Sequence, residues 1–266
     1  MRKLMTSIEK SSPLMLQRFE LKFLIPSQLI KPIQDYAETY CVADPYADEN
    51  GWYTINTLYL DSPKNTFLRR RMNGDDTRYN MRLRSYGDNP IPPYFAEIKY
   101  KQNGVVKKFR TKLTQEDWDN DFARNDGVLF GPELLNDSEN YLHFQRLAIV
   151  HNVEPKVFTQ YRRKALMSVV DDYARITFDN DLRCHPTEKF ILSPDDNMLS
   201  HYDNSTLFPD GADTILELKC TTSVPLWMMD LIKYFDLSRS RFSKFANSFF
   251  EIQSRLNYQN DIRQVL

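Results

Sequence analysis

Glycine is scarce in this sequence. The chain has 7 glycines in 266 residues, and it contains neither a GxxxxGK[ST] nor a GxGxxG motif. Loops that hold a nucleotide through backbone N–H groups need glycine at fixed positions. The common glycine-rich nucleotide-binding folds are therefore not expected here.

The sequence also has few cysteines and histidines, and its net charge is close to zero. The three cysteines, Cys41, Cys184 and Cys220, form no CxxC pair, and the four histidines form no HExxH motif. This pattern is typical of reduced thiols in a cytoplasmic protein and of histidines that serve as surface or core residues. The formal net charge is −1, so no overall basic charge indicates nucleic-acid binding.

Long apolar runs are missing as well. No segment approaches the ~18 apolar residues of a membrane-spanning helix, and the N-terminus lacks the apolar segment of a signal peptide. We therefore expect a soluble, cytoplasmic chain without a membrane span, which could still bind a membrane protein. Hydrophobic residues make up 41% of the sequence, which is enough for a substantial core.

Period-two alternation of apolar and polar residues predicts that strands dominate the chain. We expect a loose tail over residues 1–16 and one α+β domain over 17–266, with mainly antiparallel strands. The predicted strands are 17–25, 53–61, 79–86, a hairpin over 94–113 that turns at Asn103-Gly104, a hairpin over 155–184, a weak strand at 189–193, and 213–220. The predicted helices run from Pro26 to about Tyr40, from a Ser62 cap to about Met72, from a Thr114 cap to about Arg124, within 132–151, over 225–235 and over 243–256.

Charged residues occupy every second position of these strands. In the first arm of the hairpin, Glu97, Lys99 and Lys101 alternate with Ala96 and Ile98. Because strand side chains alternate between the two faces of a sheet, the charges share one face. Twelve basic and three acidic residues belong to this face: Arg18, Lys22, Arg82, Arg84, Lys99, Lys101, Lys108, Arg110, Lys112, Arg163, Arg175, Lys219, and Glu20, Glu97 and Glu217.

For any single strand, the ordinary explanation of this pattern is a solvated sheet face. Seven strands with the same bias favour a different explanation. A closed or nearly closed sheet with helices outside would direct the charges inward, where like charges are costly without an anionic partner. Arginine and lysine suit phosphate oxygens, and the few glutamates suit Mg²⁺ or Mn²⁺. The pattern therefore predicts a basic cavity for a phosphate polyanion and a divalent metal.

Short motifs follow one another in a characteristic order along the strands. They are RFELK (18–22), LYLD (58–61), RLR (82–84), EIK (97–99), KFR (108–110), YRR (161–163), RITFD (175–179), ELK (217–219) and SRFSKF (240–245). From about residue 17 to 256 the sequence resembles the VTC-type polyphosphate polymerase domain, a branch of the triphosphate tunnel metalloenzymes (the CYTH superfamily). The resemblance implies an antiparallel β-tunnel with a basic interior, helices outside, and a tri- or polyphosphate along the axis.

The resemblance also implies roles for single residues. The residues assigned to phosphoryl transfer are Arg82, Arg84, Arg163 and Lys244. Those assigned to substrate binding are Lys22, Lys99, Lys108, Arg110, Tyr161, Arg175, Lys219 and Ser243. Glu217 would be the principal ligand of Mn²⁺ or Mg²⁺, with Glu20 and Glu97 as further ligands. Either Lys107 or Lys108 could face the tunnel, and alternation with Arg110 favours Lys108.

Two departures from the wider superfamily bear on function. Tunnel hydrolases and cyclases begin with Glu-x-Glu-x-Lys, whereas Arg18 stands at the first position here, and Lys219 follows Glu217 where other branches place more carboxylates. Fewer acids favour a site for long-chain phosphate over a two-metal hydrolase. We expect transfer of a phosphoryl group from ATP to polyphosphate. A tunnel triphosphatase, and a non-catalytic polyphosphate sensor partnered with a membrane protein, remain as alternatives.

Overall fold

The computed structural model of the chain describes residues 18–102, 105–124, 129–131, 135–171, 173–194, 199–200, 208, 210–221 and 223–265. The tail predicted over residues 1–16 and the turn predicted at Asn103-Gly104 lie outside the described residues.

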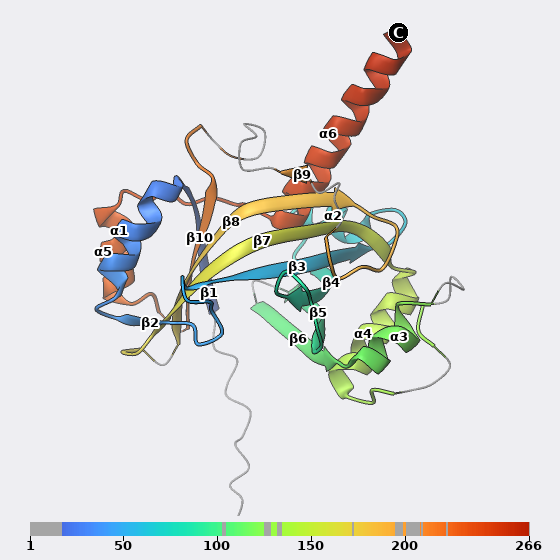
Figure 1. Cartoon of the computed structure of the whole chain (residues 1–266), viewed down its shortest axis with the longest axis horizontal. Helices are drawn as coiled ribbons and strands as arrows, with labels where there is room; N and C mark the ends of the chain where they lie inside the picture. The colour runs from blue at the N-terminus through green and yellow to red at the C-terminus, as the bar shows by residue number, and fades with distance from the viewer. Residues whose placement is uncertain are drawn as a thin grey trace, which may run out of the picture.

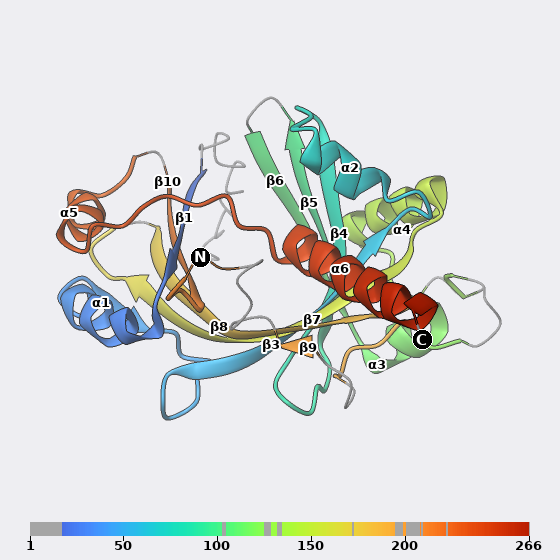
Figure 2. The same ribbon diagram turned by 90° about the horizontal axis from the view of Figure 1, so that it is seen from above.

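One antiparallel sheet forms the body of the protein (Figure 1). Seen from above, the sheet curls strongly, so that its inner face is concave (Figure 2). The strand order is β1 (Arg18–Ile25), β10 (Thr214–Thr221), β8 (Ala174–Pro186), β7 (Glu154–Ser168), β3 (Trp52–Asp61), β4 (Arg78–Tyr86), β5 (Tyr94–Gln102) and β6 (Val105–Leu113), with β2 (Cys41–Ala43) on β7 and β9 (Leu199–Ser200) on β8. The predicted α+β fold built on antiparallel strands is confirmed.

The two faces of the sheet separate apolar from charged side chains. In β4, Met81 and Leu83 are fully buried in the outer core, while Arg82 and Arg84 point into the concave side. The cause is local, because every second side chain of a strand points to the same face. Because Met81 and Leu83 are buried against the outer helices, Arg82 and Arg84 must point to the concave face.

Five helices cover the convex face in two groups. Near β1, β8 and β10, Ile33, Trp227 and Leu231 pack in one core cluster. Near β3 to β6, Phe67 and Phe144 pack in a second cluster. The helices of the first group are α1 (Ile30–Ala37) and α5 (Leu226–Tyr234), and those of the second are α2 (Thr66–Met72), α3 (Gln115–Asp121) and α4 (Glu139–His151).

The last helix, α6 (Lys244–Val265), begins on the concave side and then extends away from the body (Figure 1). Phe245 stacks on Tyr59 of β3 with ring centroids 5.0 Å apart, and Ile252 belongs to the same cluster. The start of α6 therefore lies over one part of the inner face. None of the helices among the described residues combines the length and apolar character needed to cross a membrane.

Some element boundaries differ from those predicted. The helix expected from Pro26 to Tyr40 is a 3₁₀ turn, Ser27–Leu29, followed by α1, and the unpredicted β2 comes next. Residues 189–193 form no strand, and Leu192 packs in the outer core.

The second helix starts later than predicted, at Thr66. The Asp61 carboxylate at the end of β3 accepts hydrogen bonds from the backbone N–H groups of Phe67 and Leu68, at 2.9 and 2.8 Å. It also accepts one from Ser62 N–H, at 2.7 Å. Capping therefore comes mainly from Asp61, a strand residue that sequence spacing did not indicate. The predicted cap Ser62 also contributes, because its Oγ accepts a hydrogen bond of 3.0 Å from the Thr66 N–H.

We expect Asp61→Ala to lower the free energy of unfolding by about 2 kcal/mol or more, since three buried N–H groups would lose their acceptor. Chemical denaturation followed by circular dichroism measures this change. Asp48→Ala is the control, because exposed Asp48 also accepts two backbone N–H bonds, from Asn50 and Trp52. Equal losses in the two variants would contradict the capping role of Asp61.

Candidate functional site

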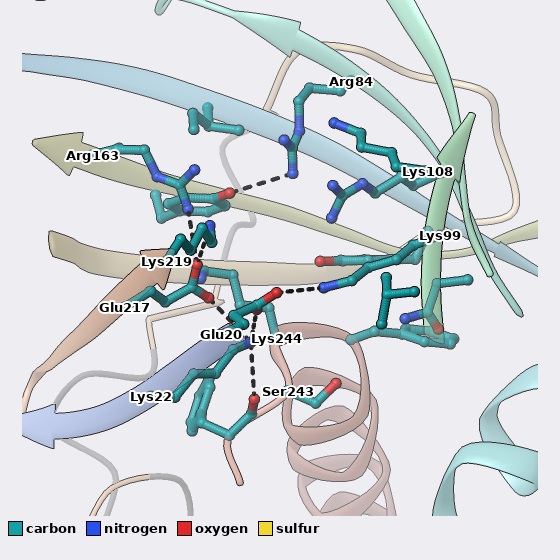
Figure 3. A pocket seen from close by; sticks show the side chains of 18 of the residues that line it. Glu20, Lys22, Arg84, Lys99, Lys108, Arg163, Glu217, Lys219, Ser243 and Lys244 are labelled. Atoms are coloured by element: carbon teal, nitrogen blue, oxygen red, sulfur yellow. Dashed lines mark hydrogen bonds and ion pairs between the residues drawn. The ribbon is translucent and has the colours of Figure 1, made fainter. Parts of the chain in front are cut away.

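The concave face of the sheet surrounds a cavity of about 2510 Å³ (Figure 3). Of the residues predicted for the site, Glu97 alone does not line it. Those that do are Glu20, Lys22, Arg82, Arg84, Lys99, Lys108, Arg110, Tyr161, Arg163, Arg175, Glu217, Lys219, Ser243 and Lys244. Lys108 lines the cavity and Lys107 does not, as the alternation with Arg110 favoured.

We call the lysine and arginine side chains that line the cavity the cationic wall. Glu97 lies behind this wall and is 1% exposed. Its Oε2 is 2.7 Å from Arg82 Nε, and its Oε1 is 2.7 Å from Lys108 Nζ and 3.1 Å from Arg110 Nε. Burial would raise the pKa of this carboxyl, but the Arg82 and Arg84 guanidiniums hold it far below its usual value. Glu97 is thus an ionised counter-charge, and this position does not fit the metal-ligand role expected for it.

Two other carboxylates share one ammonium group. Lys22 Nζ lies 3.0 Å from Glu217 Oε1 and 3.2 Å from Glu20 Oε1 (Figure 3). Lys219 Nζ is 2.6 Å from Glu217 Oε2. Burial opposes ionisation of both acids, yet Lys99 brings the pKa of Glu20 to about 2, and Lys219 and Lys22 hold the pKa of Glu217 well below its usual value. Both acids are therefore anionic at neutral pH.

The Glu20 side chain also crosses the open side of the curled sheet. β1 and β6 are the two ends of the strand order. Glu20 Oε2 of β1 accepts a hydrogen bond of 2.8 Å from Lys99 Nζ of β5, next to β6. This ion pair brings the two edges of the sheet together around the cavity.

Asp179 is the main residue of the site that the sequence analysis missed. Its carboxylate is fully buried and accepts Arg163 Nε at 2.5 Å, Arg163 Nη2 at 2.6 Å and Lys244 Nζ at 2.5 Å. Asp179 thereby connects the first residue of α6 to the sheet. The signal was present, since Asp179 follows Arg175 at an even spacing in the RITFD motif.

Tyr161 lines the cavity but is almost fully covered by neighbouring cations. It is 2% exposed, and its hydroxyl accepts a hydrogen bond of 3.5 Å from Arg84 Nη2. Lys244 Nζ lies 4.5 Å from its ring centroid, and the Arg163 guanidinium 5.5 Å from it. These contacts favour a positioning role, by hydrogen bonding and by cation–π attraction.

Cationic side chains outnumber carboxylates along the lining. Among the residues that the structure describes, sixteen lysines and arginines and four aspartates and glutamates line the cavity. Arg71 at the end of α2 and Arg78 at the start of β4 are members that sequence reasoning did not identify. This excess of positive charge attracts anions into the cavity.

Burial changes the protonation of several lysines of the lining, among them Lys108. Burial lowers the pKa of its ammonium to about 7, because contact with Glu97 only partly offsets the loss of water and the nearness of Arg82. Burial also lowers the pKa of Lys99 and of Lys219. Lys22 and Lys244 behave differently, because contacts with Glu217 and Asp179 outweigh their burial and raise the pKa of each.

The family model of the VTC domain matches residues 17–251, most of the chain. The chain belongs to the VTC domain family. This membership confirms the resemblance predicted from the ordered motifs of the strands. No curated protein matches the chain.

Solved structures similar to this VTC domain have low sequence identity to it. A candidate adenylate cyclase from Bacillus halodurans is 10% identical, with a TM-score of 0.49, over 85% of this chain and 95% of that chain. A protein from Pyrococcus horikoshii OT3 is 12% identical, with a TM-score of 0.46, over 90% and 99%. A candidate adenylyl cyclase from Hippeastrum, described as having a dominant triphosphatase activity, is 16% identical, with a TM-score of 0.44, over 87% and 94%. Because these scores are below 0.5, the function proposed below is based on the family and the cavity.

We expect tripolyphosphate binding to take up a proton at about pH 8, because a bound polyanion favours the charged form of Lys108, which is mostly neutral in the free VTC domain. The contribution of Lys108 to tripolyphosphate affinity should fall as the pH rises above about 7. Calorimetry in buffers of different ionisation enthalpy measures the uptake. Lys108→Arg stays charged and controls for titration of the ligand itself, so equal uptake by both proteins would contradict the prediction.

We expect Asp179→Asn to lower the free energy of unfolding by about 3 kcal/mol, because Arg163 and Lys244 would stay buried without their counter-charge. Tripolyphosphate should restore part of this loss. Denaturation with and without the ligand measures both effects. Asp181→Asn on the same strand is the control, since its partner Arg183 is 43% exposed and such pairs contribute at most about 1 kcal/mol. Similar losses in both variants would argue against the role of Asp179.

Proposed function

We propose that this VTC domain is a polyphosphate polymerase-like phosphotransferase, which moves the terminal phosphoryl group of a nucleoside triphosphate onto a polyphosphate chain. One observation carries the proposal. In the described part of the chain, sixteen cationic side chains line one cavity, and the Glu20–Glu217 pair lies on its wall. A linear phosphate chain is a ligand that matches such a distribution of charge.

Glu217 and Glu20 fit a shared metal ion better than Glu97 does. Mg²⁺ and Mn²⁺ are commonly held by one or two carboxylates together with substrate phosphates. No group of three His, Cys, Asp or Glu side chains suited to a metal occurs among the described residues, so phosphate oxygens would complete the coordination. The Lys22 ammonium now lies between the two carboxylates. When bound there, the ion would neutralise phosphate charge during transfer.

The remaining cations would position the phosphate groups. Arg82 and Arg84 project from β4, Arg163 projects from β7, and Lys219 projects from β10. Figure 3 shows Arg84, Arg163 and Lys219 around the cavity. Fixed cations on several walls align donor and acceptor and stabilise charge that shifts in the transition state. The attacking phosphate oxygen is already ionised, so the reaction needs no strong general base.

Incubation with ATP and Mn²⁺, followed by assays for long-chain polyphosphate and for free phosphate, tests this proposal. Polymer formation would support it. Free phosphate without polymer would instead indicate a triphosphatase. Binding of tripolyphosphate without turnover of any nucleotide would indicate a sensing module.

For Glu217→Gln we expect turnover to fall at least about a hundredfold, the scale for the loss of one strong electrostatic contributor. The amide keeps the size of the side chain but cannot supply the charge that holds the metal. Tripolyphosphate affinity should be retained or increase, because one repelling carboxylate is gone. Turnover assays and calorimetry measure the two effects separately.

Arg82→Ala is the matched comparison, since it removes a cation that contacts phosphate in ground and transition states alike. It should weaken binding and turnover together. Metal-dependent turnover that survives Glu217→Gln would show that this carboxylate does not hold the metal.

A further inference from the structure

Three of the aromatic rings that line the cavity lie next to one another on β3, β4 and β5. The rings belong to Tyr53 of β3, Tyr86 of β4 and Phe95 of β5. The Tyr53 and Tyr86 ring centroids are 6.2 Å apart, and those of Tyr86 and Phe95 are 5.6 Å apart. We name these three residues the aromatic platform. Ile91, Pro92 and Pro93 in the β4–β5 connection extend the same apolar part of the lining.

The aromatic platform directly adjoins the cationic wall. Arg110 donates a hydrogen bond of 3.0 Å to the Tyr86 hydroxyl, and its guanidinium lies 3.7 Å from the Phe95 ring centroid. Arg175 donates one of 2.9 Å to the Tyr53 hydroxyl. A phosphate held by these two arginines would place the next group of the same ligand against the rings.

The opposite ends of the same strands differ in character. β4 runs from Arg78 to Tyr86, and β5 has Phe95 near its start and Lys101 near its end. Arg78 and Lys101 also line the cavity, together with Arg71 of α2. The cavity therefore has the three rings of the platform at one end and Arg71, Arg78 and Lys101 at the other, where Tyr79 also lines it.

A polyphosphate has no apolar surface, so it gains nothing from aromatic faces. A nucleoside triphosphate has a flat base attached to its phosphates, and bases stack on aromatic side chains. We infer that the aromatic platform binds the base of the donor nucleotide, so that its phosphates point toward Arg71 and Arg78. This inference rests on the proposed function and adds the orientation of the donor. The competing explanation is that the tyrosines only position Arg110 and Arg175 through their hydroxyls.

Two substitutions at each tyrosine separate these explanations. Tyr86→Leu and Tyr53→Leu remove the ring, whereas Tyr86→Phe and Tyr53→Phe remove only the hydroxyl. Calorimetry would compare the β,γ-imido analogue of ATP with tripolyphosphate, which has the phosphates but no base. We expect each leucine variant to weaken the analogue relative to tripolyphosphate by at least about fivefold, the lower range for stacking of one base. The phenylalanine variants should leave this ratio unchanged.

Equal weakening of both ligands in the leucine variants, or no weakening, would overturn the inference while leaving the proposed function intact. If neither ligand binds the unmodified protein, the proposed function is wrong, and so is the assignment of the aromatic platform as a base-binding site. A photoaffinity label tests the same inference on the unmodified protein, so the test does not depend on the folding of a variant. Irradiation of the unmodified protein with 8-azido-ATP should label peptides that contain the aromatic platform, and labelling confined to peptides around Arg71 and Arg78 would overturn the orientation.

Discussion

The concentration of like charge on the concave face of a curled sheet is the constraint on which the rest of this structure depends. Positive side chains that face one another across a cavity repel, and an isolated buried charge is very costly. The protein limits this cost with carboxylates placed among and behind the cations. Glu97 neutralises cations of β4 and β6, Asp179 those of β7 and α6, and Glu217 those of β1 and β10.

These carboxylates orient the cations without cancelling their charge. Arg163 lies in a two-point contact with Asp179, which fixes its planar guanidinium while leaving the cavity positive. The pKa of Lys108 is lowered mainly by burial, and the nearby Arg82 and Arg84 guanidiniums lower it further. A phosphate ligand would supply the missing anions, so the same imbalance that limits stability in the free protein favours ligand binding.

Closure of the cavity depends on residues far apart in the sequence. Glu20 and Lys99 meet across the open side of the sheet, and Lys244 brings α6 to Asp179. Each contact joins segments that local folding alone would not bring together. The ionic groups that a ligand would meet are therefore also groups that join the edges of the fold, which couples ligand binding to the stability of the domain.

The sequence by itself determined which side chains share a face, because alternation in a strand is local backbone geometry. It also determined the family, since the motifs keep the order of the strands. It could not distinguish Glu97 from Glu217, which follow the same alternation. Only the tertiary structure placed Glu97 behind the wall and made Asp179 a partner of two cations, one of which is Lys244 at the start of α6. These outcomes depend on contacts between strands and a helix distant in sequence, and burial and charge pairing are properties of such contacts rather than of any single segment.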